Sequence, residues 1–451
     1  MAPLKDSAGH ALTGATGVAL DAFEHAGHQL RCFIGDPVAT IDRAIEAAPG
    51  MTMAHALKAW LYLLGTEPDG LPVARACIEQ GERCGGDARE RAHLLAARRL
   101  YEGRWREAGR ILEDLSARYP RDALALQAGH QIDFFTGDSR MLRDRIARVL
   151  PAWSEPLPGY HAVLGMYAFG LEECGEYDAA EACGRRSVAL ERRDGWGWHA
   201  VAHVCEMRNR ADEGIAWLTQ DCAAWSEDSF FAVHNWWHLA LFHLDRGDTD
   251  QVLALYDGAV RGGQSGVVLD MIDASALLWR LALLGTDVGD RWQALADRWA
   301  PLATAGNYAF NDWHALMAFI GAGRRDAQQA VLESLRRQAA GGAGDIARFA
   351  REVGLPAAEA MLAFGQGRYR DAVRLLRGIR HEANRFGGSH AQRDLIDLTL
   401  LEAAVRAGDG PLAMALAQER LARRPHGQLP RRLLERATQA ARGCRVPAAG
   451  G

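Results

Sequence analysis

Short breaks, most of them containing glycine, recur along this chain, and each follows an apolar helical run. They stand 34 to 44 residues apart, which is the signature of a repeat protein. Glycine suits these points because a helix commonly ends with a residue in the left-handed conformation, which only Gly and Asn adopt at low cost. A second amphipathic run follows most breaks, so the predicted unit is helix, turn, helix. The breaks begin at Gly65, Gly103, Gly137, Gly175, Asn209, Gly247, Gly285, Gly323, Gly367 and Gly408.

The unit resembles the tetratricopeptide repeat, in which an aromatic residue follows the glycine and a small residue comes three positions later. The matching pairs are Trp105 and Ala108, Tyr177 and Ala180, and Tyr369 and Ala372. Because such units bury a continuous core only by stacking, we predict an all-α solenoid of about ten helical hairpins, able to close toward a ring. We expect an N-terminal helix or cap over residues 1–30, the solenoid over 31–425, and a basic C-terminal helix with a flexible tail over 426–451.

The net charge and the cysteine spacing limit the binding partners and the cellular compartment that the sequence predicts. The net charge of −5 gives no broad electrostatic footprint for nucleic acid or an anionic membrane. The eight cysteines form no Cys-x-x-Cys pair, and no signal core or long apolar run occurs. We therefore predict a cytoplasmic protein with free thiols and with neither a nucleic-acid nor a membrane partner. A solvated terminal helix explains the basic residues near the end, Arg423, Arg424, Arg431, Arg432, Arg436, Arg442 and Arg445.

Polar and aromatic residues recur at equivalent positions on the first helix of successive units. Counted back from each break, they occupy positions within about one helical turn of one another, so they share a face. The positions nine to thirteen residues before a break hold His55, His93, Met166, His199, His234, Trp237, His238, Asp273, Asn311 and His314. A lone histidine on such a helix is more often a core residue bonded to a carbonyl, but a whole lining of imidazoles and carboxylates is expensive to bury. We expect these side chains to converge on an inner surface.

Five motifs carry a resemblance to a known family, in the order in which that family has them. They are His199-Ala-Val-Ala-His203-Val-Cys-Glu206-Met, His234-Asn-Trp-Trp-His238-Leu-Ala-Leu, Asp273-Ala-Ser-Ala-Leu-Leu-Trp279-Arg-Leu, Asn311-Asp-Trp-His314-Ala-Leu-Met-Ala-Phe and Gly388-Ser-His390-Ala-Gln392-Arg393-Asp394. With these motifs the chain resembles the tetratricopeptide repeat protein 38 family over nearly its whole length. The resemblance implies the repeat fold and marks these positions as motif residues, without implying an activity.

The leading functional hypothesis is a small-molecule pocket with acid–base chemistry, because histidine exchanges protons near neutral pH and a nearby carboxylate can orient it. The predicted catalytic residues are His238, His314, His390, Asp273 and His199. The predicted ligand-binding residues are His203, Glu206, His234, Trp237, Asp270, Trp279, Asn311 and Arg393. No nucleophile or phosphate-loop motif occurs, and no strand is expected, so the class extends to lyases, cyclases, isomerases and hydrolases that need no cofactor.

Two other hypotheses stay open. Pairs of histidines four residues apart could chelate a metal from one helix face, with His199, His203, Glu206, His234 and His238 as the ligands. Alternatively, the chain is an interaction scaffold that binds a peptide, or a second copy of itself as a homo-oligomer.

Two glycine-containing loops could control access to such a pocket. They are residues 261–270, before the Asp273 helix, and residues 384–390, before the last motif. A local explanation competes at the second loop, because Ser389 and Gln392 have the spacing of a capping box. Asn311 could likewise serve only as a helix N-cap.

Overall fold

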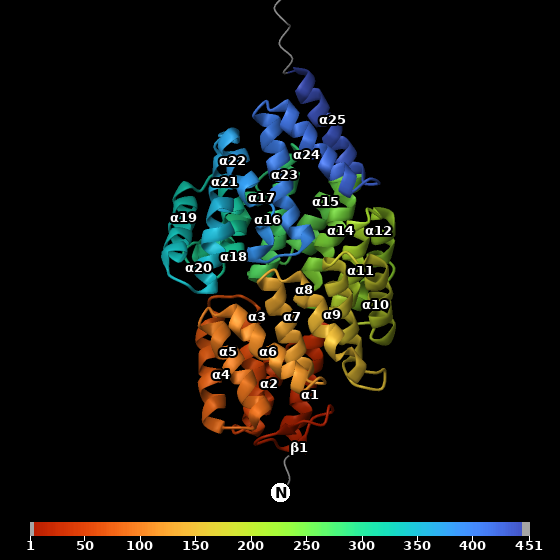
Figure 1. The fold of residues 1–451 in the computed structure, drawn as a ribbon, viewed down its shortest axis with the longest axis vertical. Coiled ribbons are helices and arrows are strands. Elements are labelled where there is room, and N and C mark those ends of the chain that lie inside the picture. Colours follow the sequence, from red (N-terminus) through yellow and green to blue (C-terminus); the bar gives the residue numbers. More distant parts are fainter. Residues whose placement is uncertain (1–3, 444–451) are drawn as a thin grey trace, which may run out of the picture. The chain divides into compact units, whose positions relative to one another are not determined.

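A computed structural model describes residues 4–443, which divide into two compact units. Within the described residues, unit 1 comprises residues 4–204, 220–235 and 343–346, and unit 2 comprises residues 205–219, 236–342 and 347–443. The predicted flexible tail, with Cys444 and Arg445, lies outside the described residues. The chain is an all-α helical-repeat protein, as predicted (Figure 1). The expectation of no strands was wrong at one point, a two-stranded antiparallel ladder at the N-terminus.

Unit 1 begins with the strands of this ladder and continues as helices. Its elements are β1 (Leu4–Lys5), β2 (Ala11–Leu12), α1 (Gly17–Cys32), α2 (Pro37–Ala47), α3 (Thr52–Leu64), α4 (Gly70–Cys84), α5 (Ala88–Tyr101), α6 (Trp105–Arg118), α7 (Ala123–Phe135), α8 (Ser139–Val149), η1 (Leu150–Ala152), α9 (Tyr160–Glu173), α10 (Tyr177–Leu190), most of α11 (Gly195–Met207) and α13 (Cys222–Ser226). Helices that follow one another pack in pairs, α1 on α2, α3 on α4, α5 on α6 and α9 on α10.

Unit 2 is helical throughout its described part. Its elements are α12 (Ala211–Thr219), most of α14 (Ala232–Arg246), α15 (Thr249–Leu255), η2 (Tyr256–Val260), α16 (Val268–Leu283), α17 (Arg291–Trp299), η3 (Ala300–Leu302), α18 (Ala309–Gly321), α19 (Arg325–Ala340), most of α20 (Asp345–Phe349), η4 (Ala350–Gly354), α21 (Leu355–Gly365), α22 (Tyr369–Ile379), η5 (Ala383–Phe386), α23 (His390–Arg406), α24 (Gly410–Arg423) and α25 (Gln428–Gly443). Here α16 packs on α18 and on α23, which places the middle of the unit beside its C-terminal hairpins.

The breaks end helices as the spacing predicts. At Gly103 the backbone φ is 77°, the Gly103 amide donates to the Leu100 carbonyl at 3.0 Å, and the Arg104 amide donates to the Arg99 carbonyl at 2.8 Å. This pair of hydrogen bonds is the Schellman motif, which satisfies carbonyls left over at a helix end. Asn209, the break without glycine, adopts the same conformation with φ 56°.

The first break is the exception. Gly65 has φ −72° and stays in the right-handed region, so the left-handed residue is its neighbour Thr66, with φ 56°. The expectation of a left-handed glycine was therefore wrong by one position there, because Thr66 takes the strained conformation despite its branched side chain.

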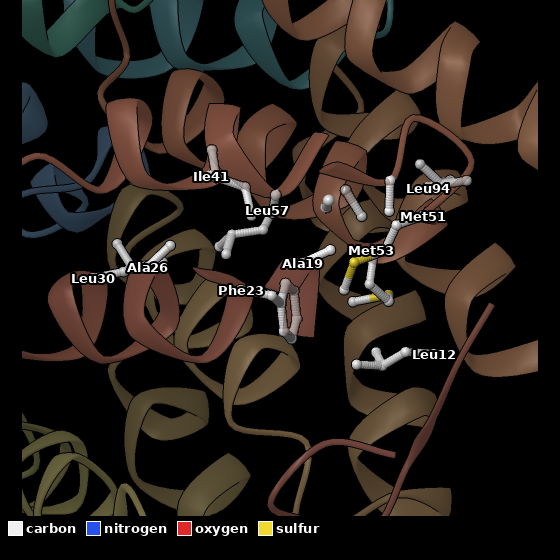
Figure 2. Close-up of a cluster of buried hydrophobic side chains, with 14 residues drawn as sticks. Leu12, Ala19, Phe23, Ala26, Leu30, Ile41, Met51, Met53, Leu57 and Leu94 are labelled. Carbon is white, nitrogen blue, oxygen red and sulfur yellow. The ribbon is translucent and has the colours of Figure 1, made fainter. Parts of the chain in front are cut away.

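The small residues of the repeat signature lie in the core between neighbouring helices. Ala108, Ala180 and Ala372 are fully buried, so neighbouring helices can approach closely at these points. In unit 1 a cluster joins β2, α1, α2 and the start of α3, with Phe23, Leu30, Ile41 and Leu57 among its side chains (Figure 2). Burying an apolar side chain of this size contributes about 1.5–3 kcal/mol, so continuous packing rather than helix propensity stabilises the hairpins.

Two further features of the described chain bear on the predictions. None of the helices between residues 4 and 443 is at once long enough and apolar enough to span a lipid bilayer. The described cysteines are all free thiols, which agrees with the absence of paired spacings in the sequence.

Candidate functional site

Three of the predicted histidines meet in unit 1. His199 and His203 stand one turn apart on α11, and His234 lies in the first turn of α14. The Nε2 atoms of His199 and His234 are 3.1 Å apart, and the rings of His199 and His203 lie 4.4 Å apart, centre to centre. Each of the three offers a ring nitrogen within 4.8 Å of the others. We call these three residues the histidine cluster.

The histidine cluster has an apolar surround and one carboxylate. The rings of Phe169, Trp196 and Phe231 lie 5.3, 4.6 and 5.2 Å from the His199 ring. Glu172, on α9, places a carboxylate oxygen 3.4 Å from Nδ1 of His203, and neither side chain is exposed at all. A buried carboxylate beside an imidazole fixes the tautomer of the ring and leaves Nε2 of His203 as the nitrogen able to bind a ligand.

A second group of metal-ligating residues in unit 1 was missed in the sequence. His28 and Cys32, one turn apart on α1, lie with His161 of α9 within the same 4.8 Å limit. Nδ1 of His161 is 2.8 Å from Asp194, and burial raises the pKa of the Cys32 thiol. The i, i+4 spacing of His28 and Cys32 is the only sequence signal for this group, because His161 comes from a distant repeat.

In unit 2 the predicted His238 and Glu206 also meet. Nδ1 of the fully buried His238 lies 3.2 Å from the Glu206 carboxylate. Arg424, at the end of α24, stands 3.7 Å from the same carboxylate. This carboxylate therefore faces both an imidazole and a guanidinium.

A small cavity of about 40 Å³ adjoins Glu206. Its charged lining residues come from five helices and the C-terminal end of α24, and they are Glu206, Asp245, Arg280, Asp394, Arg420 and Arg424. We call this space the unit 2 cavity. Since one water molecule needs at least about 10–15 Å³ of such volume, the space accommodates a few waters or one small polar group.

Most charges around the unit 2 cavity are paired. Arg420 donates two hydrogen bonds to Asp394, at 2.7 and 2.8 Å. Burial alone would raise the pKa of Asp394, but Arg420 and Arg424 outweigh it and hold that pKa well below its usual range. Asp245 accepts from the backbone amides of Gln428 and Leu429 at the start of α25, where a helix favours negative charge.

Arg280 is the exception among these charges. It is 3% exposed, and its hydrogen bonds go to the backbone carbonyls of Ala391, at 2.6 Å, and Ala276, at 3.3 Å. Its guanidinium also lies 5.3 Å from the ring centre of Trp237, a cation–π distance. Among the described residues no carboxylate lies within 4.0 Å of it, and burial lowers the pKa of Arg280 to about 10.

His314 does not join either site. It is fully buried on α18, and its Nδ1 lies 2.8 Å from the carbonyl of Phe310 one turn earlier. Burial lowers the pKa of His314 to about 3, so its imidazole is neutral at physiological pH. This geometry favours a packing role over proton transfer for His314.

The remaining predicted residues are spread over unit 2. Trp279 is buried, and its indole nitrogen donates to Thr399 at 3.0 Å, which is a packing contact. Asp270 and the buried Asp273 lie on α16. Asn311 is buried in the first turn of α18, where Tyr308 rather than Asn311 is the N-cap, so the capping explanation was wrong. His390 begins α23.

The loops before α16 and α23 have local roles. Ser389 and Gln392 form the reciprocal hydrogen bonds of a capping box, which confirms the local explanation at that loop. Arg393 donates to the Gly388 carbonyl, and Arg261 donates to the Ser265 carbonyl at 2.5 Å. These bonds tie each loop to its own neighbourhood.

Two residues that line the unit 2 cavity, Arg280 and Asp394, each stand one position away from a predicted site residue. Trp279 and Arg393 were predicted, whereas Arg280 and Asp394 line the cavity. One residue rotates a side chain by about 100° around a helix, enough to move it from the packed face to the cavity. The missing signal was the helix phase, which a motif alone does not give.

The fold and these sites define a tetratricopeptide-like helical-repeat protein. No family model matches the chain. Among solved structures, it is similar to the human IFIT1 dimer with m7Gppp-AAAA at 14% identity and a TM-score of 0.40, over 96% of each chain. It is also similar to yeast Tom70 at 13% identity and a TM-score of 0.32, over 92% of this chain and 86% of that chain. Likeness this distant carries no argument about what this chain binds.

Proposed function

We propose that this protein, a member of the tetratricopeptide repeat protein 38 type acting in the cytoplasm, binds a small organic anion in the unit 2 cavity. The observation that carries the proposal is the buried guanidinium of Arg280, which lines the cavity without a carboxylate within ion-pair distance among the described residues. A buried cation is costly unless an anion or several hydrogen bonds compensate it. A bound anion would supply that compensation.

The neighbouring charges support one anionic group rather than several. Arg420 is committed to Asp394, and Arg424 stands beside Glu206, so Arg280 is the cation left over. Arginine presents donors in a planar fork that matches a carboxylate or a phosphate with two hydrogen bonds. The cavity volume of about 40 Å³ suits a carboxylate, with the rest of the molecule toward the cavity mouth.

The Glu206–His238 pair adds a proton donor and acceptor beside the anion. Glu206 lines the cavity, and His238 lies behind it at 3.2 Å, so a proton can pass between the two. This arrangement supports acid–base chemistry on a bound molecule, with Glu206 as the group that faces it. His238 would hold the Glu206 carboxylate in place rather than touch the ligand.

Isothermal titration of the full chain with acetate, succinate and inorganic phosphate tests the proposal. We expect a carboxylate to bind and Arg280→Met to weaken it by about 10- to 100-fold, the worth of a charged hydrogen bond. Arg374→Met is the matched control, because it removes an arginine from α22 whose side chain is 72% exposed. Mass spectrometry of an extract from denatured protein would identify a molecule that copurifies.

Two results would contradict the proposal. Equal affinity of wild-type and Arg280→Met protein for each anion would remove Arg280 from any binding role. Binding of an extended peptide by wild-type and Arg280→Met protein alike, with no response to the three anions, would favour the interaction scaffold instead.

A further inference from the structure

We propose that unit 1 carries a binding site for a divalent transition-metal ion, such as Zn²⁺, formed by His199, His203 and His234. All three proposed ligands belong to unit 1, whereas unit 2 residues line the proposed anion cavity. Imidazole nitrogen is a preferred ligand of Zn²⁺ and of its neighbours in the first transition series.

The spacing of the nitrogens fits a metal. With Zn–N bonds of about 2.0–2.1 Å, two nitrogens of a tetrahedral site stand about 3.3 Å apart. The observed Nε2 separation of His199 and His234 is 3.1 Å, and the third ring offers a nitrogen within 4.8 Å of both. A small rotation of the His203 ring would close the set.

The local environment compensates the charge of the ion. Three neutral imidazoles bring no negative charge, but the Glu172 carboxylate lies 3.4 Å from Nδ1 of His203 with both side chains fully buried. A carboxylate bonded to the far nitrogen of a ligating histidine orients the ring and raises its basicity. Glu172 is therefore a positioning residue, and the ion would in turn stabilise its buried charge.

The surround of the histidine cluster would admit an ion from one side. His234 is only partly buried, so the ion and a small ligand have a route to the cluster from that side. The aromatic rings of Phe169, Trp196 and Phe231 would keep the remaining surround apolar.

A hydrogen bond between neutral rings is the competing explanation, because His199 and His234 at 3.1 Å also fit an N–H···N contact. The group of His28, Cys32 and His161 is the competing location.

Cobalt titration of the full chain, after dialysis against a chelator, separates these explanations. We expect one Co²⁺ per chain, with the visible absorption of a four-coordinate ion bound to nitrogen. His203→Gln and His234→Gln should each weaken binding by more than about 100-fold, and Glu172→Gln by about 10- to 100-fold with the stoichiometry unchanged. Far-UV circular dichroism of each variant checks that it folds.

Cys32→Ser is the matched control, since it alters the other group and leaves the histidine cluster intact. Absence of Co²⁺ binding by the wild-type chain would overturn the proposal and leave the His199–His234 contact as a hydrogen bond. So would binding that survives His234→Gln but is lost in Cys32→Ser. Because His234 is partly exposed, its variant tests the site even if substitutions at His199 or His203 prevent folding.

Discussion

The histidine cluster of unit 1 and the cavity of unit 2 differ in charge. His199 and Trp237 both stand ten residues before a break, yet one belongs to a group of imidazoles and the other stacks against a buried arginine. In unit 1, imidazole nitrogens lie beside the Glu172 carboxylate. In unit 2, ion pairs surround Arg280, which has no carboxylate partner among the described residues. The two sites therefore carry different chemistry within one repeat fold.

The two sites also carry different costs in the absence of a ligand. A neutral imidazole loses little on burial when a neighbour accepts its hydrogen bond, so the histidine cluster is tolerable without an ion. A buried guanidinium such as Arg280 stays charged and depends on compensation. We infer that the two sites select ligands of opposite charge.

The largest expected effect is on the unfolding free energy of unit 2, where the paired Arg420 is compared with Arg280, which lacks a carboxylate partner in the described part of the chain. Arg420→Met leaves Asp394 without its two hydrogen bonds and should cost about 3–5 kcal/mol of unfolding free energy. Arg280→Met removes two hydrogen bonds to carbonyls but also a buried cation that lacks a carboxylate, and these effects oppose each other, so it should cost less than Arg420→Met. Urea denaturation of both variants measures the difference, and similar losses would mean that Arg280 is compensated in the folded protein.

A second prediction crosses the two sites. A ligand at 100 times its dissociation constant stabilises the folded state by about 2.7 kcal/mol. Zn²⁺ should therefore raise the melting temperature of wild-type and Arg280→Met protein but not of His234→Gln. A carboxylate that binds should raise the melting temperature of wild-type and His234→Gln protein but not of Arg280→Met. If one variant lost the response to Zn²⁺ and the response to the carboxylate, the two sites would be coupled, which contradicts the proposal that they bind independently.

A third prediction compares the pH dependence of two buried aspartates. In unit 1, burial would raise the pKa of Asp122, but His93 at 2.9 Å and Arg89 at 2.9 Å outweigh it and hold the pKa well below its usual range. In unit 2, burial raises the pKa of Asp312 to about 7, and the hydrogen bond from Gln338 only partly opposes this. One carboxylate stays charged and the other is protonated below neutral pH.

The two shifts act in opposite directions on stability. Between pH about 4 and 7, the folded state keeps a proton on Asp312 that the unfolded chain releases, so this residue makes stability fall as pH rises, by at most about 1.4 kcal/mol per pH unit. The stabilisation from Asp122 is instead present above pH about 4 and is lost as the pH falls further. Asp312→Asn should flatten the slope between pH 4 and 7 in urea titrations, whereas the exposed Asp326→Asn should not. An unchanged slope in Asp312→Asn would assign it to another group.

Much of the fold followed from the sequence because helix ends are local. A left-handed residue after an apolar run satisfies the last carbonyls with its own neighbours, as at Gly103 and Asn209, so spacing alone located the hairpins. Gly65 shows the limit, since Thr66 beside it takes the strained conformation. The short ladder of β1 and β2 has no signal in a two-residue segment.

The candidate sites were only partly predictable, and helix phase is the reason. Histidines four residues apart necessarily share a helix face, so the pairing of His199 with His203 could be foreseen. Nothing in the sequence distinguished Arg280 from Trp279 or Asp394 from Arg393, because both members of each pair lie in one motif. The repeat position of His314 made it a predicted catalytic residue. In the structure His314 is fully buried beside the carbonyl of Phe310, and burial keeps its imidazole neutral by lowering its pKa.

The sequence by itself determined an all-α repeat chain, the ends of most of its helices and the set of residues able to carry chemistry, since each depends on interactions within a few residues. Only the tertiary structure decided which of those residues meet. His234 reaches His199, and Glu206 reaches His238, across more than thirty residues of chain. Distance and desolvation arise from packing between helices, which no single repeat encodes.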